Sequence, residues 1–363
     1  MNASPDRILI VKLGSIGDAV NTLPLVNVLK EASPDRRLAW LIEPKSFPIV
    51  KNCRAVDRFI VFERRRKIQG ALGALREIRD FRPELVIDLQ RILRSSFFTF
   101  LSGSPLRLGF DRVRCKEGSW LFTNRRIPPR DPKRHMVLQY LEFAEYLEAE
   151  LTDIRFDLSI DVEDRSTARR ILPGAFSRSR PIALNIGATK EANRWPVSHW
   201  SGLIEILLAE TSSPLVLTGG PDDRVRGEEL VSAASDRNRI FNSAGLTSLG
   251  ELGGIFLECC LAVSGDTGPM HIASALGIPT VGLFGPADPR RTGPFRHLDM
   301  VIESPLECSP CGRRRCRPNR CMEEIAPEDV WERIRDLILG DEPDVPEREG
   351  SAGEEGKRES EIS

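Results

Sequence analysis

An acidic residue stands at the end of a glycine-rich loop, where it could act as a base. The loop comprises residues 12–18, with Gly14 and Gly17 inside it and Asp18 at its end, and it directly follows a short apolar run. The glycines permit a tight turn that leaves backbone amides exposed at the start of the next helix. The spacing differs from the G-x-G-x-x-G of a dinucleotide site, and Asp18 would repel a phosphate. Asp18 is therefore either a general base at the end of a strand or a cap of the following helix.

A second glycine-rich turn gathers polar groups at the start of another predicted helix. Asp266 and Thr267 stand near the N-terminus of this helix, and His271 lies within its first turns. The helix dipole and the free amides suit a diphosphate, with a stabilisation of about 1 to 2 kcal/mol in a partly buried site. An ordinary capped helix is the alternative, which three polar groups and two glycines make less favourable. The turn at residues 285–289 is expected to line the same cleft.

Two groups of arginines could bind an anionic ligand. The first is the run Arg64, Arg65, Arg66 and Lys67, which follows a strand-like segment, and the second is the pair Arg125 and Arg126. Guanidinium groups bind carboxylates and phosphates through two parallel hydrogen bonds. The alternative is a solvated run of charge, as is common on protein surfaces.

Four of the eight cysteines crowd into one short loop. Cys308, Cys311, Cys316 and Cys321 have spacings compatible with one tetrahedral zinc ion or one iron–sulfur cluster. The five arginines interleaved with them would lower the thiol pKa values and favour thiolates. The sequence therefore predicts a structural metal site rather than four unrelated free thiols. The other four cysteines are expected to be buried small side chains or plain thiols, because structural disulfides are rare in the cytosol.

The elements that must position these residues alternate between strand and helix patterns. Short apolar runs at residues 7–11, 38–42, 59–62 and 85–89 are typical of strands buried on both faces of a parallel sheet. Helical spacing follows the first run, with Pro24 placed in the first turn, and recurs at residues 68–81. This alternation is the signature of βαβ units.

The same pattern restarts in the second half of the chain. After a helix over residues 135–149, regular order lapses, and the charged residues 161–180 are interpreted as a linker region. Strands are predicted at residues 181–186, 215–218, 261–264 and 280–284, and a last amphipathic helix at residues 326–339. The predicted fold is therefore α/β, with two Rossmann-like domains, residues 1–160 and 181–325, facing each other across a cleft. Residues 340–363 form an acidic tail with almost nothing to bury, so disorder is expected there.

Length and composition agree with this organisation. A chain of 363 residues is long enough for two domains. The formal net charge of -1 argues against a nucleic-acid partner. The N-terminus lacks the features of a signal peptide, and no apolar run approaches the roughly 20 residues needed to span a bilayer. The sequence predicts a cytoplasmic protein, and contact with a membrane surface stays open.

Several motifs occur together in an order that is specific to one family. They are residues 12–18 followed by Thr-Leu-Pro at 22–24, Asp-Leu-Gln at 88–90, Asn-Arg-Trp-Pro at 193–196 with Trp200, Thr-Gly-Gly-Pro at 218–221, and Asp-Thr-Gly-Pro-Met-His at 266–271 continuing to Gly285 and Pro286. The chain thus resembles the lipopolysaccharide heptosyltransferases of glycosyltransferase family 9. The resemblance implies a GT-B fold and an inverting transfer that needs no metal or other catalytic cofactor. It also implies an ADP-heptose donor held by the second domain, and an inner-core lipopolysaccharide acceptor, Kdo or the first heptose, held by the first.

The resemblance also implies roles for individual residues. Asp18 matches the base that takes the proton of the acceptor hydroxyl. The donor would be bound by Asp266, Thr267, Gly268 and His271, and its phosphates by Gly187, Ala188 and Thr189. The family commonly has lysine where this chain has Asn193, so Lys190 or Arg194 is expected to supply the positive charge. The acceptor would be bound by Lys12, Ser15, Gly17, Arg64, Arg65, Arg66, Lys67, Arg125 and Arg126.

Two other functions fit parts of the sequence. A sugar-nucleotide epimerase of the same fold would need no acceptor patch, so the basic run at residues 64–67 argues against it. A non-catalytic protein that binds a nucleotide-sugar or a glycan would not need Asp18.

Overall fold

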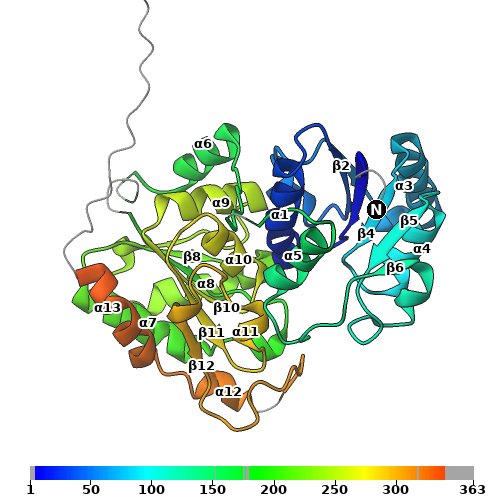
Figure 1. Cartoon of the computed structure of the whole chain (residues 1–363). Coiled ribbons are helices and arrows are strands. Elements are labelled where there is room, and N and C mark those ends of the chain that lie inside the picture. Colours follow the sequence, from blue (N-terminus) through cyan, green and yellow to red (C-terminus); the bar gives the residue numbers. More distant parts are fainter. Residues whose placement is uncertain (1–4, 152, 175, 177–179, 317–318, 340–363) are drawn as a thin grey trace, which may run out of the picture.

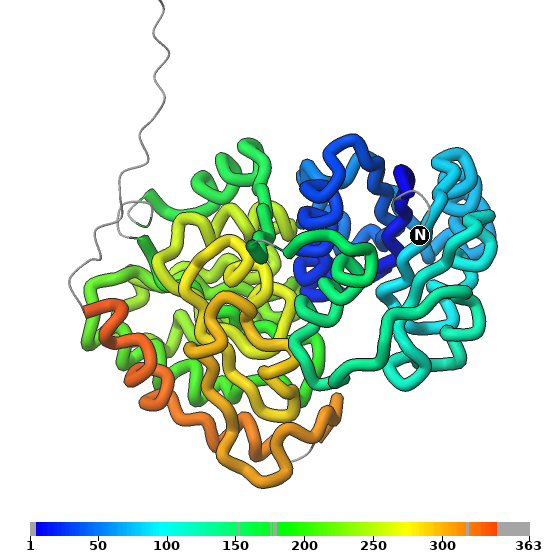
Figure 2. Tube along the Cα trace, in the orientation of Figure 1, coloured from blue at the N-terminus to red at the C-terminus, as the bar shows by residue number. Residues whose placement is uncertain are grey.

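The chain folds into two α/β bodies that lie side by side (Figure 1). The computed structural model describes residues 5–151, 153–174, 176, 180–316 and 319–339. The first body holds strands β1 to β6 and the second holds β7 to β12, each in one six-stranded sheet. Along the described residues, the chain passes from the first body to the second between helices α5 and α6, which can be followed along the green part of the tube in Figure 2.

The first sheet is entirely parallel, with the strand order β3-β2-β1-β4-β5-β6. Its strands are β1 (Arg7–Val11), β2 (Arg37–Ile42), β3 (Arg58–Val61), β4 (Leu85–Asp88), β5 (Leu106–Gly109) and β6 (Arg125–Arg126). Consecutive residues of a strand point to opposite faces, so a strand covered on both sides must be apolar throughout. Ile8 and Leu9 of β1 are both fully buried but belong to different clusters of the core, one on each face of the sheet.

Helices cover both faces of the first sheet. They are α1 (Ile16–Glu31), α2 (Phe47–Val50), α3 (Lys67–Phe81), α4 (Leu93–Leu101) and α5 (Met136–Tyr146), with two short 3₁₀ helices, η1 (Arg64–Arg66) and η2 (Ser119–Phe122). Side chains of α1 and α5 pack on the face of Ile8. Side chains of α3 and α4, among them Leu75 and Phe98, pack on the face of Leu9.

The second sheet is also parallel, with the strand order β12-β11-β10-β7-β8-β9. Its strands are β7 (Ile182–Asn185), β8 (Leu215–Thr218), β9 (Ile240–Asn242), β10 (Leu261–Gly265), β11 (Thr280–Phe284) and β12 (Val301–Glu303). Its helices are α6 (Val162–Ile171), α7 (Val197–Glu210), α8 (Arg224–Ala233), α9 (Leu249–Glu258), α10 (Gly268–Ala275), α11 (Pro289–Thr292), α12 (Arg320–Glu323) and α13 (Pro327–Leu339). The strands and helices predicted from the apolar pattern are confirmed to within a few residues, apart from two differences.

The first difference concerns the start of α1. The predicted helix had Pro24 in its first turn, but α1 begins at Ile16 and Pro24 lies in its interior. An interior proline removes a backbone hydrogen bond and normally disfavours a helix. Twelve of the 16 residues of α1 are buried, so packing on every side outweighs this local preference.

The second difference concerns the predicted linker region, where regular order was expected to lapse. It contains helix α6, which packs on α9. A Cβ on Gly250 or Gly254 of α9 would stand 2.1 Å from Oδ2 of Asp164 and 2.8 Å from Cβ of Ala168, respectively. The two helices therefore approach at backbone distance, and α6 needs few apolar side chains, which is why its sequence resembles a loop.

No helix in the described ranges is long and apolar enough to cross a membrane. The predicted acidic tail at residues 340–363 lies outside the described residues.

Candidate active site

The predicted base and the predicted donor loops lie at the points where the two sheets reverse their strand order. The reversal falls between β1 and β4 in the first sheet and between β7 and β10 in the second. In parallel α/β sheets, ligands bind at the carboxyl ends of the strands at such a point. The loop that ends at Asp18 follows β1, and Arg91 follows β4. The loop at residues 187–190 follows β7, and Asp266 follows β10, so both sheets offer binding loops at their own reversal point.

The two bodies touch at the starts of α1 and α10, which lie next to each other at the junction in Figure 1. A Cβ on Gly17 would stand 2.3 Å from Cδ2 of His271, and a Cβ on Gly268 would stand 2.9 Å from Cβ of Ile16. One glycine from each body thus permits a contact that a larger residue would obstruct. This contact brings the loop that contains Asp18 against the loop that contains Asp266.

Asp18 is oriented by three neighbouring groups. Its Oδ2 atom accepts the Ser15 backbone N–H at 3.2 Å and lies 3.2 Å from Nζ of Lys12. Its Oδ1 atom accepts the Tyr140 hydroxyl at 3.1 Å. Burial by itself would raise the pKa of Asp18, but the charge of Lys12 and the hydrogen bonds outweigh it, so the pKa lies below its ordinary value. Asp18 is therefore ionised at neutral pH. Because 31% of its side-chain surface is exposed, a proton donor can reach it.

Lys12 and Tyr140 are buried beside Asp18. Burial lowers the pKa of Lys12, an effect that the charge of Asp18 opposes and the charge of Arg91 reinforces. Burial and the charge of Asp18 raise the pKa of Tyr140 well above its ordinary value. Tyr140 therefore keeps its proton and donates a hydrogen bond to Asp18, while Lys12 provides a buried positive charge at the same carboxylate.

Sequence reasoning missed three residues of this centre: Tyr140, Arg91 and Arg291. Tyr140 lies within the helix predicted at residues 135–149, which was given no role in the site. Arg91 stacks on Phe110, with 4.9 Å between its guanidinium carbon and the ring centroid, and directly follows the Asp-Leu-Gln motif. Arg291 lies in α11, shortly after the turn at residues 285–289, and its Nε is buried with no hydrogen-bond partner in the described part of the chain. The charges of both arginines lower the pKa of Tyr140 against the larger effects of burial and Asp18, so both lie close to the tyrosine.

A hydrogen-bonded network fixes the predicted donor loops. The Asn185 side-chain amide donates to Oγ of Ser264 at 2.9 Å and to Oγ1 of Thr267 at 3.0 Å, which ties β7 to β10. The Asn193 amide donates to the backbone oxygen of Asp266 at 2.9 Å and to its Oδ2 at 3.1 Å. Asn193 thus orients Asp266 from the position where the resembling family commonly has lysine.

Both cations predicted to replace that lysine are engaged by carboxylates. Nζ of Lys190 lies 3.5 Å from Oδ2 of Asp266, and Nη1 of Arg194 lies 2.8 Å from Oδ1 of the buried Asp223. Asp223 also stands under the loop at residues 187–190, since a Cβ on Gly187 would approach its Oδ2 to 2.6 Å. A phosphate at this loop would therefore compete with these carboxylates for the two cations.

His271 is buried at the contact between the bodies. Burial lowers its pKa, against the opposing charges of Asp266 and Asp18. The imidazole is therefore neutral at neutral pH, and it can accept or donate one hydrogen bond without adding charge to the site.

The two basic groups predicted to hold the acceptor do not lie together. Residues 64–67 are exposed at η1, after β3, whereas Arg125 and Arg126 form β6. β3 and β6 are the two edges of a six-stranded sheet, about 24 Å apart at about 4.8 Å per strand. A single sugar cannot contact both groups.

The structure does not support the predicted metal site at Cys308, Cys311, Cys316 and Cys321. Among the described residues, no group of three or more His, Cys, Asp and Glu side chains is arranged to hold a metal ion. The expected thiolate is also wrong for Cys321. Burial, followed by the neighbouring cysteines, raises the pKa of its thiol, so the nearby arginines do not dominate there.

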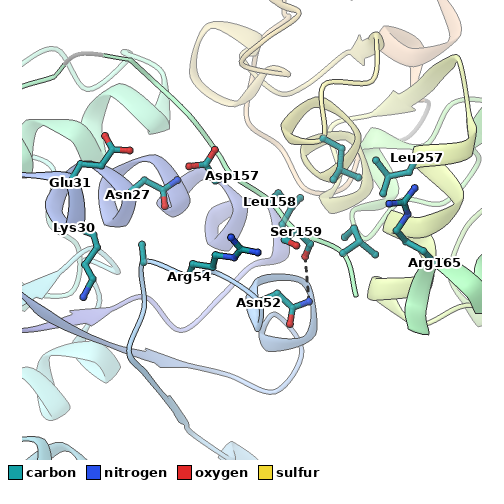
Figure 3. A pocket seen from close by; sticks show the side chains of 13 residues that line it. Asn27, Lys30, Glu31, Asn52, Arg54, Asp157, Leu158, Ser159, Arg165 and Leu257 are labelled. Atoms are coloured by element: carbon teal, nitrogen blue, oxygen red, sulfur yellow. Dashed lines mark hydrogen bonds between the residues drawn. The ribbon is translucent and has the colours of Figure 1, made fainter. Parts of the chain in front are cut away.

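A pocket of about 760 Å³ lies away from this centre, between the two bodies. Figure 3 shows it bordered by Asn27, Lys30 and Glu31 at the C-terminal end of α1. Ser159, in the segment that connects α5 to α6, borders it as well. None of the predicted site residues lines it. The candidate active site lies at the other end of α1, where Asp18 and the predicted donor loops meet.

Comparisons with known proteins find relatives of this chain by sequence and by structure. A model of the family described as glycosyltransferase family 9 (heptosyltransferase) matches residues 73–321. Lipopolysaccharide heptosyltransferase 1 of Pseudomonas aeruginosa is 30% identical over 323 residues, which cover 85% of this chain and 87% of that protein. The ADP-heptose lps heptosyltransferase II of Escherichia coli has a similar solved structure, with a TM-score of 0.75, 23% identity, and coverage of 92% of this chain and 98% of that one.

The E. coli heptosyltransferase WaaC was solved with ADP-2-deoxy-2-fluoro heptose. It gives a TM-score of 0.67 at 23% identity and covers 91% of this chain and 99% of that one. These structural similarities confirm the predicted two-domain α/β architecture of the GT-B type.

Proposed function

Because this chain belongs to glycosyltransferase family 9, the heptosyltransferases, we propose that it transfers heptose from ADP-heptose to the inner core of lipopolysaccharide. The chain is a glycosyltransferase, and the epimerase and non-catalytic alternatives are not favoured. The donor is proposed from relatives whose names or bound ligands contain ADP-heptose. The acceptor is proposed from relatives named for lipopolysaccharide.

The contact between Gly17 and His271 is the observation that carries the mechanism. It holds the Asp18 carboxylate of the first body next to the donor loop of the second. We propose that Asp18 removes the proton of the acceptor hydroxyl as the oxygen attacks the anomeric carbon of the heptose, inverting that centre without a metal. ADP departs towards the N-terminus of α10, where free amides and the helix dipole stabilise its charge.

The excess of positive charge around Tyr140 supports an anionic substrate at this point. The cations Lys12, Arg91 and Arg291 act on Tyr140 or its neighbours, and the carboxylates that oppose them there are Asp18 and Asp88. Asp88, the last residue of β4, is buried, and burial raises its pKa. We propose that Arg291, which lies in the same body as the donor loops, contacts the departing diphosphate.

The experiment that tests the function is a panel of donors and acceptors followed by mass spectrometry. The expected product is a Kdo- or heptose-terminated core extended by one heptose, formed from ADP-heptose. Transfer of another sugar from another nucleotide, with no product from ADP-heptose, would overturn the proposed donor.

We expect the basic run at residues 64–67 to serve the acceptor. Replacing Arg65 and Arg66 together with alanine should raise the acceptor KM by roughly fivefold to thirtyfold, since each lost charged contact is weakened by its exposure to solvent. The affinity for ADP, measured by calorimetry, should stay unchanged. In the parent protein, the acceptor KM should rise with salt.

The matched control for this double variant is Arg76→Ala, which removes an exposed arginine further along α3. An unchanged acceptor KM in the double variant would mean that the run is only a solvated group of charges. Loss of ADP binding would mean that the assignment of acceptor and donor to the two bodies is reversed.

The metal site at the cysteine loop stays a prediction outside the catalytic proposal. If it is correct, protein purified without oxygen carries about one zinc ion or one iron–sulfur cluster per chain. Elemental analysis beside a thiol count makes the measurement. Four freely titratable thiols at Cys308, Cys311, Cys316 and Cys321 with no bound metal would contradict it.

We also propose that the protein acts in the cytoplasm, at the cytoplasmic face of the inner membrane. The reason is the proposed acceptor, which is linked to a lipid and therefore anchored in a membrane. An enzyme that extends its sugar core must work at the surface of that membrane.

A further inference from the structure

Three large apolar side chains form a stripe on the outer face of α4. Leu93, Phe97 and Phe100 are 51%, 45% and 53% exposed, and their spacing of four and then three residues aligns them along one side of the helix. The buried side of α4, with Phe98, faces the sheet. The apolar stripe is therefore not part of the core of the first body.

The stripe continues onto neighbouring elements. The ring centroid of Phe100 lies 5.9 Å from that of Phe122 in η2. Leu121, which precedes Phe122, is 66% exposed. On α3, which packs on the same face of the sheet as α4, Ile68 and Leu72 are also exposed. Figure 1 shows α3 and α4 together at the outer edge of the first body, away from α7 and α13. Exposed apolar side chains in such a contiguous group mark an interaction surface.

The segment of the chain that carries the stripe is strongly basic. Residues 64–126 contain 15 lysines and arginines against six aspartates and glutamates, a net charge of +9 in a chain whose total is -1. Arginines also border the apolar side chains directly. The guanidinium carbons of Arg112 and Arg126 lie 4.6 and 5.5 Å from the ring centroid of Trp120, and that of Arg107 lies 5.7 Å from the ring centroid of Phe100.

We propose that this surface docks on an anionic lipid bilayer, with Leu93, Phe97 and Phe100 inserted among the acyl chains near the head groups. An apolar stripe bordered by arginines is the pattern of an interfacial membrane-binding surface, in which the cations meet lipid phosphates. A second copy of the chain fits less well, because two surfaces of the same strong positive charge repel each other. The biological purpose rests on the proposed function, since a lipid-anchored acceptor would be presented at that bilayer, but docking itself does not.

The test is flotation of the full chain with lipid vesicles. The parent protein should bind vesicles that contain phosphatidylglycerol, bind phosphatidylcholine vesicles weakly, and dissociate as salt rises. The double variant Phe97→Ser/Phe100→Ser should bind the anionic vesicles at least about tenfold more weakly. The matched control Val225→Ser/Leu246→Ser removes two exposed apolar side chains from the second body and should bind like the parent.

A second variant guards against a folding defect in the first. Ile68→Ser/Leu72→Ser changes side chains that are 75% and 60% exposed, so it should keep the parent's melting temperature and still weaken binding. The inference is overturned if the parent ignores anionic vesicles, or if folded stripe variants bind them like the parent. It is also overturned if the parent forms a dimer that the stripe variants abolish.

Turnover separates this inference from the proposed function. On a water-soluble, deacylated core acceptor, the Phe97→Ser/Phe100→Ser variant should turn over like the parent, whereas turnover of the lipid-linked acceptor in vesicles should fall. Vesicle binding without any turnover of ADP-heptose would overturn the proposed function and leave the docking surface in place.

Discussion

Replacing Asp18 with asparagine should lower turnover by roughly 10² to 10⁴, because the variant loses the group that takes the acceptor proton. Asparagine has the same size, and its side-chain oxygen can still accept the Ser15 backbone N–H, so α1 keeps its cap. The buried Lys12 loses its counter-ion in the variant, and its pKa should fall further. The measurement is single-turnover kinetics beside ADP binding by calorimetry, which should persist.

The matched control for this variant is Tyr140→Phe. It removes one hydrogen bond to Asp18 but leaves the carboxylate, so its loss of turnover should be much smaller. Near-parental turnover of Asp18→Asn would exclude the base assignment and leave Asp18 as a helix cap.

The pH profile should carry the signature of a lowered pKa. In the parent protein, kcat/KM should stay constant as the pH falls through the ordinary range of an aspartate, and it should decline only below that range, where Asp18 becomes protonated. A variant that removes the charge of Lys12 should shift this decline to higher pH, because the pKa of Asp18 would move back towards the ordinary value of an aspartate.

The second large effect is expected from Gly17→Ala, which should lower kcat by about 10²-fold. The added methyl group would stand 2.3 Å from Cδ2 of His271, so the buried imidazole must move or the starts of α1 and α10 must separate. A displacement of about 1 Å at the reacting groups is enough to cost about 10²-fold. The measurement is steady-state kinetics with saturating donor and acceptor.

The matched control for this variant is Gly14→Ala in the same loop. A Cβ at that position would meet only Oγ of Ser46, at an ordinary 3.5 Å, so activity should be close to that of the parent. If Gly17→Ala is as active as Gly14→Ala, close contact between the bodies is not needed for the reaction.

Local sequence pattern was sufficient to predict the fold and the loops of the candidate site. The family resemblance, drawn from motifs such as residues 266–271, is confirmed by the family match, and the architecture by the similar structures. These features were readable because buried parallel strands are apolar throughout and glycine turns follow them. The start of α1 and the helix α6 were not readable, since packing against other elements decides both.

The missed members of the site share a physical reason. They come from three segments that are distant in the sequence: Tyr140, Arg91 and Arg291. Their connection with Asp18 can be recognised only in the folded chain, where the first sheet and the contact between the bodies bring them together. A sequence shows the type of a side chain but not the charges that surround it. The same reason explains Cys321, whose pKa follows its burial rather than the arginines nearby in the sequence.

The close packing of α6 on α9 has a consequence for how the two bodies can move relative to each other. Because α6 packs on α9 of the second body at backbone distance, we expect a rotation of one body against the other to pivot where the connecting segment enters α6, near Ile160. The C-terminal end of α1 borders the same pocket as Ile160, whereas Asp18 lies about 20 Å further along that helix. A rotation of about ten degrees at this pivot is therefore expected to move the Asp18 carboxylate by about 3 Å, the length of one hydrogen bond.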